Sequence, residues 1–427
     1  MSAAGERGAR ADAVPSQPPP SLADAPRVAI AVPTIRNPER LGRCLDAARH
    51  VATDDGVEIE LIVVLDGADP DVAVFLAERA PDATVVSWPE RRGLAAGLNA
   101  AFRATSCSHV AVLQDDAVPQ PGWLATLRRS AGQYPRAGAV GSLVLSPDGN
   151  VQTAGAILGG DGTPAVPWTG EPPPATTFAE VRAVDYVGTA SVLVSRAAWS
   201  AVGGFDEDFY PAIYVDVDFC TGLWRAGWLV LLDPHSVVSH ERFGSTTQRF
   251  REFLYQRNRV RFMTKWGSFV AGRPPGAQSA SEVEAAIARV ARWLEDPPAA
   301  SSPSGGGPPA EASPIVYVAR ERDLLRAYVT ELESRVAELI TESAALSAAH
   351  DELHAAHHDL MSTHVGLDST HEELEAAHRN LVSAHHKLDA AHRELRRTPW
   401  KPIARRIRRV LRPRRRTHDD GTTTAST

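Results

Sequence analysis

The chain has 427 residues, of which 43% are hydrophobic and 23% charged, as in ordinary soluble globular domains. This length fits one large or two medium domains. The composition excludes collagen and a wholly disordered chain, and no stretch approaches the roughly 20 apolar residues that a membrane-spanning helix needs. The three cysteines, Cys44, Cys107 and Cys220, are far apart and form no CxxC pair, so we expect neither a disulfide framework nor a zinc ribbon.

Residues 1–26 are rich in Ala, Pro and Gly and lack the apolar core of a signal peptide. They predict a disordered leader on a cytoplasmic protein.

Residues 27–268 alternate short apolar runs with helical patterns. The runs at 28–32, 59–65 and 110–113 are each followed by polar residues: Thr34, Asp66, and Gln114 to Asp116. The alternation predicts an α/β fold with a largely parallel sheet. Ligands bind beyond the carboxyl ends of the strands in such sheets, so we expect an active site where these polar residues meet.

These strand ends resemble glycosyltransferase family 2, the inverting nucleotide-sugar enzymes with a GT-A fold, over about residues 28–266. The first run ends in Pro-Thr as in the family, and Val-Val-Leu-Asp-Gly at 63–67 is similar to its Val-Val-Asp-Asp-Gly, with Leu65 in place of the first acid. Residues 92–99 resemble a helix start near the donor phosphates. The resemblance implies donor contacts by Thr34, Asp66, Gly93 and Asn99.

Residues 113–119 read Leu-Gln-Asp-Asp-Ala-Val-Pro and resemble the family's DxD element. Hard oxygen ligands at a strand end hold Mg2+ or Mn2+, which neutralises the donor diphosphate as the sugar leaves. The resemblance implies that Asp116 binds this metal and that Gln114 and Asp115 contact the donor. Gln114 replaces the first acid, so its contact would be a hydrogen bond rather than a charge.

Residues 203–209 read Gly-Gly-Phe-Asp-Glu-Asp-Phe and, with the acids that follow at 216 and 218, resemble the family's acceptor block. Inverting transfer needs a base within hydrogen-bond reach of the acceptor hydroxyl, and by position Asp216 is that base. Asp218 lies on the acceptor side, where it orients or caps the helix, and Val215 replaces an acid. His240 fits the position of a metal-binding histidine.

Residues 255–259 read Tyr-Gln-Arg-Asn-Arg, similar to a run in many bacterial cell-surface glycan transferases of this family. These arginines either meet phosphates of a lipid-linked acceptor or form a solvated face, and the sequence does not choose between the two.

Residues 269–314 contain Pro-Pro pairs and Gly- and Ser-rich patches, which predict a linker, interrupted by a short helix at 281–294. Residues 315–398 contain no proline and predict one long helix. A leucine recurs at every seventh position from Leu325 to Leu395, which predicts a left-handed coiled coil that joins copies of the enzyme into a homo-oligomer. With these leucines at d, seven successive a positions are histidine: His350, His357, His364, His371, His378, His385 and His392.

This histidine seam has three interpretations. The histidines set the register, or they make the oligomer acid-sensitive because partly buried imidazoles prefer to be neutral, or they form a ladder of Zn2+ sites between chains. Acid sensitivity is favoured over metal, because facing a positions supply two nitrogens per layer where a closed zinc site has four ligands.

Residues 393–416 contain twelve Lys or Arg and one acid, a net charge of +11, which leaves −18 for the rest of a chain whose total is −7. Trp400 and the apolar residues after it, spaced as on one helix face, predict that 399–427 is a basic amphipathic tail on an anionic membrane surface. A disordered basic tail or a nucleic-acid contact is the alternative, and no nucleic-acid-binding motif supports the latter.

The sequence thus predicts a metal-dependent inverting glycosyltransferase that moves a sugar from a nucleotide sugar to a glycan or lipid-linked acceptor. The expected setting is bacterial surface-polysaccharide synthesis at the inner face of the plasma membrane. Nucleotide-sugar synthesis is disfavoured because no Gly-rich phosphate loop follows the first run. The remaining alternative is a scaffold whose transferase domain has lost activity, which Leu65, Gln114 and Val215 would permit.

Overall fold

The structure is a computed structural model, and it describes residues 27–67, 69–174, 179–241, 247–276, 280–295, 311–364 and 371–397. The chain divides into two compact units, Met1–Tyr328 and Val329–Thr427. The predicted leader at 1–26 and the predicted tail at 399–427 lie outside the described residues. None of the helices described is long and apolar enough to span a membrane.

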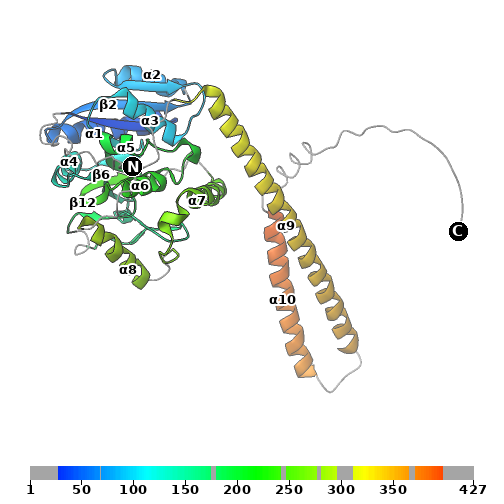
Figure 1. The fold of residues 1–427 in the computed structure, drawn as a ribbon. Helices are drawn as coiled ribbons and strands as arrows, with labels where there is room; N and C mark the ends of the chain where they lie inside the picture. Colours follow the sequence, from blue (N-terminus) through cyan, green and yellow to red (C-terminus); the bar gives the residue numbers. More distant parts are fainter. Residues whose placement is uncertain are drawn as a thin grey trace, which may run out of the picture. The chain divides into compact units, whose positions relative to one another are not determined.

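The first unit is built on a mixed sheet with a parallel half (Figure 1). Strand β1 (Arg27–Thr34) lies between β2 (Glu58–Asp66) and β4 (His109–Leu113), and all three are parallel. Strand β3 (Thr84–Trp88) extends this half beyond β2. Strand β11 (Ser191–Ser195) runs antiparallel beside β4 and begins the other half.

In the other half, β6 (Ala137–Leu145) pairs with β11 and lies parallel to β12 (Leu229–His240). Strand β5 (Ala117–Pro119) pairs antiparallel with the last residues of β12. Because β5 begins just after the end of β4, this pairing brings His240 beside the predicted metal-binding segment. The remaining short strands described are β7 (Val151–Thr153), β8 (Ile157–Leu158), β9 (Pro164–Ala165) and β10 (Arg182–Ala183).

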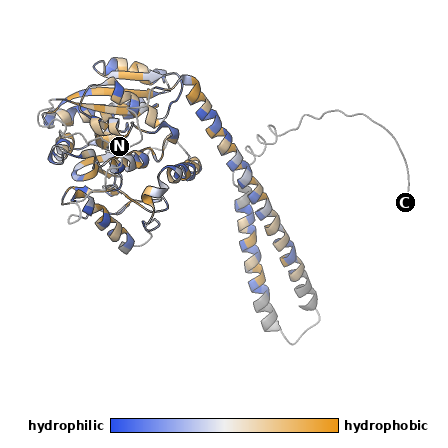
Figure 2. Cartoon of the chain, in the orientation of Figure 1, coloured by the Kyte–Doolittle hydropathy of each residue, from blue (hydrophilic) through white to orange (hydrophobic). Residues whose placement is uncertain are grey.

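Helices flank the sheet: α3 packs on β1, β2 and β3, while α4 packs on β6 and β12. The interiors of β1, β4 and β11 are apolar and fully or almost fully buried, as expected for strands covered on both faces, and Figure 2 shows the central strands largely in the hydrophobic colour. The edge strand β3 is mostly exposed. The predicted α/β sheet with flanking helices is confirmed. The bounds of its helices are α1 Pro38–Asp54, α2 Pro70–Arg79, α3 Leu94–Ala104, α4 Trp123–Gln133, α5 Arg196–Ala201, η2 Glu207–Phe209, α6 Val215–Arg225, α7 Gln248–Val270, α8 Ala280–Ala291 and η3 Arg292–Leu294.

The described part of the predicted linker is packed structure. The helix expected at 281–294 is present as α8 and η3, and it packs within the first unit. Val290 is fully buried, and the Trp293 ring lies 4.5 Å from that of Trp224. Arg273 and Arg289 both pair with the buried carboxylate of Asp185. The prolines and glycines in this segment predicted a linker, but α8 has an apolar face, and that face is buried by packing against the rest of the unit.

The first unit also includes the start of α9 (Pro314–His364), which the sequence assigned to the coiled coil. Tyr317 and Leu324 are buried, and the Tyr328 ring packs on Phe250 and Phe253. The heptad pattern did not distinguish this aromatic stretch from the seam that follows it.

In the second unit, α9 and α10 (His371–Arg397) run side by side in opposite directions (Figure 1). The ring of His350 lies 4.9 Å from that of His385, and the ring of His357 lies 5.0 Å from that of His378. The partners' numbers rise on one helix as they fall on the other, which is the register of an antiparallel pair.

The single helix predicted for 315–398 is therefore two helices in the described part. Residues 365–370 lie outside that part. The coiled-coil oligomer stays a prediction.

Candidate active site

The three polar strand ends lie at one edge of the sheet. Thr34 is opposite Leu65 in the β1–β2 register, next to Asp66, and Ala31 is opposite Val112 in the β1–β4 register. The end of β1 is therefore flanked by Asp66 on one side and the segment after Leu113 on the other. The clustering that the sequence predicted for these strand ends is confirmed.

Thr34 and Asp115 are directly linked at this edge. The Thr34 hydroxyl donates to Asp115 Oδ2 at 2.6 Å, and Arg40 Nη2 lies 3.1 Å from Asp115 Oδ1. Arg40 stands in the first turn of α1, whose N-cap Asn37 accepts a hydrogen bond from the Arg40 backbone N–H. Burial raises the pKa of Asp115, while the Thr34 and Arg40 contacts oppose that rise. Thr34, Arg40 and Asp115 thus form a compact polar group at this edge.

The Arg40 guanidinium has spare donor capacity there. Its Nε is buried and has no hydrogen-bond partner among the residues described. Its Nη1 lies 4.0 Å from Asp116 Oδ2, so this cation lies near both acids of the segment.

Asp66 binds the start of helix α3. Its carboxylate accepts from the backbone N–H of Arg92 at 2.5 Å and of Gly93 at 3.1 Å. Gly93 has a φ of +83°, and a Cβ there would lie 2.8 Å from the Pro211 carbonyl oxygen, so the close approach requires glycine. Arg91 Nε lies 3.7 Å from Asp66 Oδ2. Asp66 and Gly93 are brought together, as their predicted common role requires.

Asp116 and His240 are in contact. His240 Nε2 lies 2.9 Å from Asp116 Oδ1, and each side chain is only 10% exposed. Asp116 and Glu241 also share a backbone hydrogen bond, in which Glu241 N donates to Asp116 O at 3.0 Å. The pair predicted to bind metal thus has the proximity that a shared ion requires.

Gln152 on β7 sets the tautomer of His240. The Gln152 amide nitrogen donates to the His240 carbonyl at 3.2 Å, which turns the amide oxygen toward His240 Nδ1 at 2.5 Å. Because an amide oxygen only accepts, Nδ1 carries the proton. In the neutral ring Nε2 then presents its lone pair to Asp116, an arrangement that a cation between the two atoms stabilises.

Asp216 lies in the first turn of α6, after two residues with left-handed backbone. Ile213 and Tyr214 have φ of +67° and +69°, which is uncommon for side chains of this size. The Asn258 amide holds this turn by donating to the carbonyls of Ala212 and Ile213, both at 2.8 Å. Such strained backbone is found at functional sites when its surroundings fix it.

Asp216 accepts a hydrogen bond from the Val217 backbone N–H at 2.9 Å, and no side chain donates to it within the described ranges. Burial raises the pKa of Asp216 to about 6. A Cβ added to Gly188 would lie 3.7 Å from Asp216 Oδ2, and the next residue, Thr189, accepts a hydrogen bond from the Gln114 amide at 3.3 Å. The segment 188–189 therefore joins Asp216 to the strand end that carries Gln114.

Asp218 has a different environment from Asp216. Its carboxylate accepts from Trp266 Nε1 at 2.6 Å and pairs with Lys265 Nζ at 2.8 Å, and it is nearly fully buried. Burial raises its pKa to about 6, against the opposing effect of Lys265. These contacts tie α6 to α7. They agree with the predicted role of Asp218 in orienting the helix, and they leave its carboxylate engaged inside the protein.

Asn99 is an interior residue. Its amide donates to the Phe205 carbonyl at 2.9 Å and to Glu207, and its oxygen accepts from Trp199 Nε1 and the Phe205 N–H. The side chain is fully buried with its hydrogen bonds made inside the protein. It holds the loop at 203–207 against α3, which differs from the predicted donor contact.

The arginines at 257 and 259 also make structural contacts. Arg257 donates to the Tyr210 carbonyl at 3.1 Å, and Arg259 donates to the Asp161 carbonyl at 2.9 Å. Each therefore anchors α7 to a loop, and neither of the two roles left open by the sequence describes them.

Sequence reasoning missed Arg40 and Gln152. Arg40 had a signal, because Asn37-Pro38 marks a helix start directly after a strand end. Gln152 had none, since a three-residue strand between turns has no periodicity to read.

Comparison with known proteins identifies the family of this chain. The family model for glycosyl transferase family 2 matches residues 29–179. The chain is 30% identical over 210 residues to the N-acetylglucosaminyl-diphospho-decaprenol L-rhamnosyltransferase of Mycobacterium tuberculosis, covering 41% of this chain and 68% of the relative. The chain belongs to glycosyl transferase family 2. It is accordingly a glycosyltransferase.

This glycosyltransferase is also 31% identical over 258 residues to the O-antigen biosynthesis protein RfbC of Myxococcus xanthus, covering 58% of this chain but 19% of that relative. Among solved structures, a mannosyltransferase from Pyrobaculum calidifontis in complex with GDP-Man and Mn2+ is 20% identical, with a TM-score of 0.43 over 65% of this chain and 72% of that chain.

Proposed function

We propose that this glycosyltransferase transfers a sugar, with inversion, from a nucleotide-sugar donor to a lipid-linked saccharide. The observation that carries the proposal is the pairing of Asp116 and His240 beside Asp115, at the edge to which Gly188 and Thr189 join Asp216. Asp116 and His240 suit the binding of a diphosphate through a metal ion, and Asp216 suits the removal of a proton from a hydroxyl group.

On the donor side, Asp66, Thr34 and Asp115 form the floor of the nucleotide site. Asp66 fixes the first turn of α3 through two backbone N–H groups. Arg40, with its buried unpartnered Nε, is the donor that a phosphate oxygen would satisfy. Arg91 beside Asp66 adds a second cation near the nucleotide.

Asp116 and His240 fit a divalent cation. Two adjacent ligands of an octahedral ion at about 2.0–2.1 Å lie about 2.9 Å apart, and Asp116 Oδ1 and His240 Nε2 are 2.9 Å apart. A mixed oxygen and imidazole set suits Mn2+ better than the harder Mg2+. When bound, the ion would neutralise charge that develops on the leaving diphosphate. Gln152 occupies Nδ1 of His240 and so leaves Nε2 as the nitrogen that would bind the ion.

Asp216 acts as the general base. Its oxygen takes the proton of the acceptor hydroxyl while that hydroxyl attacks the sugar carbon from the side opposite the leaving nucleotide. Its raised pKa, about 6, brings the carboxylate closer to the basicity that proton transfer at neutral pH favours. No side chain among those described competes for its oxygens, so they stay available to the acceptor.

The choice of acceptor is supported by the rhamnosyltransferase relative, whose name places its acceptor sugar on a diphospho-decaprenol. The basic tail supports a membrane setting, because residues 393–416 carry a net charge of +11. A bacterial cell-surface polysaccharide is the corresponding product class.

Transfer of labelled sugar to a short-chain polyprenyl diphosphate N-acetylglucosamine tests the proposal, with the anomeric configuration of the product read by NMR. Inversion relative to the donor is expected, and retention would contradict the single displacement.

For the membrane setting, deletion of residues 399–427 should release the protein from anionic vesicles while leaving turnover on a soluble acceptor unchanged. Undiminished vesicle binding by the deletion variant would refute the tail's role.

A further inference from the structure

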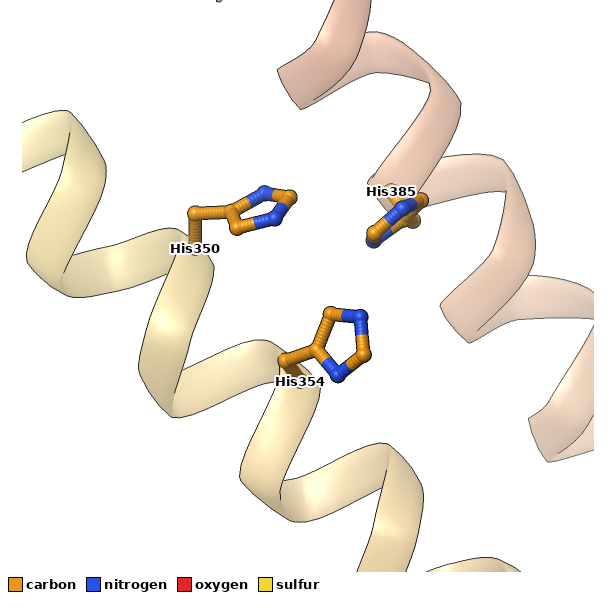
Figure 3. A group of neighbouring side chains, drawn as sticks. All are labelled: His350, His354 and His385. Carbon is orange, nitrogen blue, oxygen red and sulfur yellow. The ribbon is translucent and has the colours of Figure 1, made fainter.

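Three histidines gather in the second unit, in helices that the glycosyl-transfer mechanism does not use. His350 and His354 lie on α9 and His385 lies on α10, with the three imidazoles turned toward one another (Figure 3). One ring nitrogen from each can be chosen so that all three atoms lie within 4.8 Å of one another.

The two helices contribute in a way that suits a shared ligand. His350 and His354 are one helical turn apart, so their side chains leave the same face of α9. Their rings lie 5.8 Å apart, and the His385 ring lies 4.9 Å from His350 and 5.6 Å from His354. The three rings thus surround one point between the helices.

His354 supplies the nitrogen that heptad counting omitted. It occupies position e, directly after Leu353 at d, whereas His350 and His385 are both at a. Two facing a positions give two nitrogens per layer, as in the neighbouring pair of His357 and His378. The layer of His350 has three, which is the number of protein ligands in open zinc sites.

A second observation concerns hydrogen bonding. The Nδ1 atom of His350 is buried and has no hydrogen-bond partner within the described part of the chain. A buried polar nitrogen without a partner is costly, and bonding to a metal ion would satisfy it.

His385 has an outer partner. Asp389 Oδ2 lies 3.5 Å from His385 Nε2, one turn further along α10. A carboxylate behind a metal-binding imidazole fixes its orientation and raises its basicity. With Nε2 directed to Asp389, Nδ1 of His385 is the atom left for an ion.

We propose that His350, His354 and His385 of one chain bind a divalent transition-metal ion of the Zn2+ class, with water as the fourth ligand. Nitrogens bound at about 2.0–2.1 Å in a tetrahedral site lie about 3.4 Å apart, so the distances between the three nitrogens, which are within 4.8 Å, would shorten by up to about 1.4 Å around the ion. Imidazole selects Zn2+, Ni2+ or Cu2+ over Mg2+. The ion ties α9 to α10.

The test is a Zn2+ titration of the full chain in excess Mg2+, which occupies hard-ligand sites and leaves imidazole clusters free. Bound Zn2+ is measured by equilibrium dialysis and elemental analysis. Each of His354→Gln and His385→Gln is expected to bind one Zn2+ fewer than wild type at the same free Zn2+ concentration, because the affinity of the site should fall by more than the roughly 10–100-fold that loss of an outer-shell partner alone causes. His386→Gln is the matched control, because His386 is exposed and outside the cluster.

Two measurements keep the result interpretable. His354 is exposed, so His354→Gln should retain the metal-free helicity of wild type by circular dichroism, and lost Zn2+ binding then reports the ligand itself. Sedimentation at saturating Zn2+ should give an unchanged mass, because all three ligands come from one chain. Equal Zn2+ binding by wild type and both variants overturns the site, and a Zn2+-dependent doubling of mass overturns its assignment to one chain.

Discussion

Tyr317, near the start of α9, donates its hydroxyl to Glu207 Oε2 at 2.6 Å. Glu207 belongs to the Gly-Gly-Phe-Asp-Glu block, and its other oxygen accepts from Asn99. Arg320 on the next turn of α9 pairs with Glu207 and Asp208. The first turns of α9 are thus held by the same carboxylate that anchors the acceptor-side loop, so this part of the helix belongs to the catalytic unit.

Tyr317→Phe should destabilise the first unit by about 1–3 kcal/mol, because it leaves a buried carboxylate oxygen short of a donor. At an unfolding entropy of about 2.1 cal/mol/K per residue, a unit of about 300 residues shifts by roughly 1.5 °C per kcal/mol, which calorimetry can measure. Tyr328→Phe is the control, since Tyr328 packs through its ring alone on Phe250 and Phe253. Equal melting temperatures for the two variants would argue against the hydrogen bond as an anchor.

Asp216→Asn should reduce transfer by about 10²–10⁴-fold while nucleotide-sugar binding stays nearly intact, because the proposed role of Asp216 is toward the acceptor hydroxyl and not toward the donor. Transfer is followed by product formation and donor binding by calorimetry. Asp218→Asn is the matched variant, and it should lower the melting temperature more than turnover because its partners are Trp266 and Lys265. Wild-type turnover in Asp216→Asn would refute the base assignment.

The pH profile of kcat/KM gives an independent test of Asp216. The base acts only when deprotonated, and burial raises its pKa to about 6. Activity should therefore be constant above about pH 6 and fall about tenfold per pH unit below it. The pKa of Asp218 is also raised to about 6, so Asp218→Asn should keep the same acid limb. A limb centred near pH 4, or one that disappears in Asp218→Asn, would assign the proton elsewhere.

Gln152→Leu should weaken the affinity of the proposed site for Mn2+ by about 10–100-fold, because His240 Nδ1 loses the acceptor that fixes its tautomer. The readout is the Mn2+ concentration that gives half-maximal activity. Gln152→Glu keeps an acceptor toward Nδ1 and should stay close to wild type. If both variants shift the half-maximal Mn2+ concentration equally, the tautomer is not what Gln152 controls.

The strand ends were predictable because each follows a short apolar run, and parallel strands place their carboxyl ends together. Pairing Asp116 with His240 needed the family resemblance, since 124 residues separate them and no spacing rule connects them. A sequence motif places a residue along the chain but does not say where its side chain points. Asn99 was therefore expected at the donor, although its side chain points into the interior. That orientation depends on how α3 is rotated about its axis, which is set by the elements that pack against it.

Helices α9 and α10 show what a periodic sequence pattern cannot predict. The leucine and histidine repeat correctly marked helix, but the same repeat fits a partner in another chain or in the same chain. The antiparallel pairing of His350 with His385 requires two separate helices. The heptad repeat does not specify where one helix ends and the next begins, so it did not predict this pairing. His354 was overlooked because only a and d positions were counted.

Nucleotide release from a panel of nucleotide sugars, measured with acceptor in Mn2+ and in chelator, tests the central claim most directly. Wild type should release nucleotide from one donor with Mn2+, and both chelator and the double variant Asp116→Asn/His240→Ala should abolish that release. Undiminished release in chelator or in the double variant would contradict the assignment of Asp116 and His240. No release from any donor, with Mn2+ and acceptor present, would contradict the proposed transfer itself.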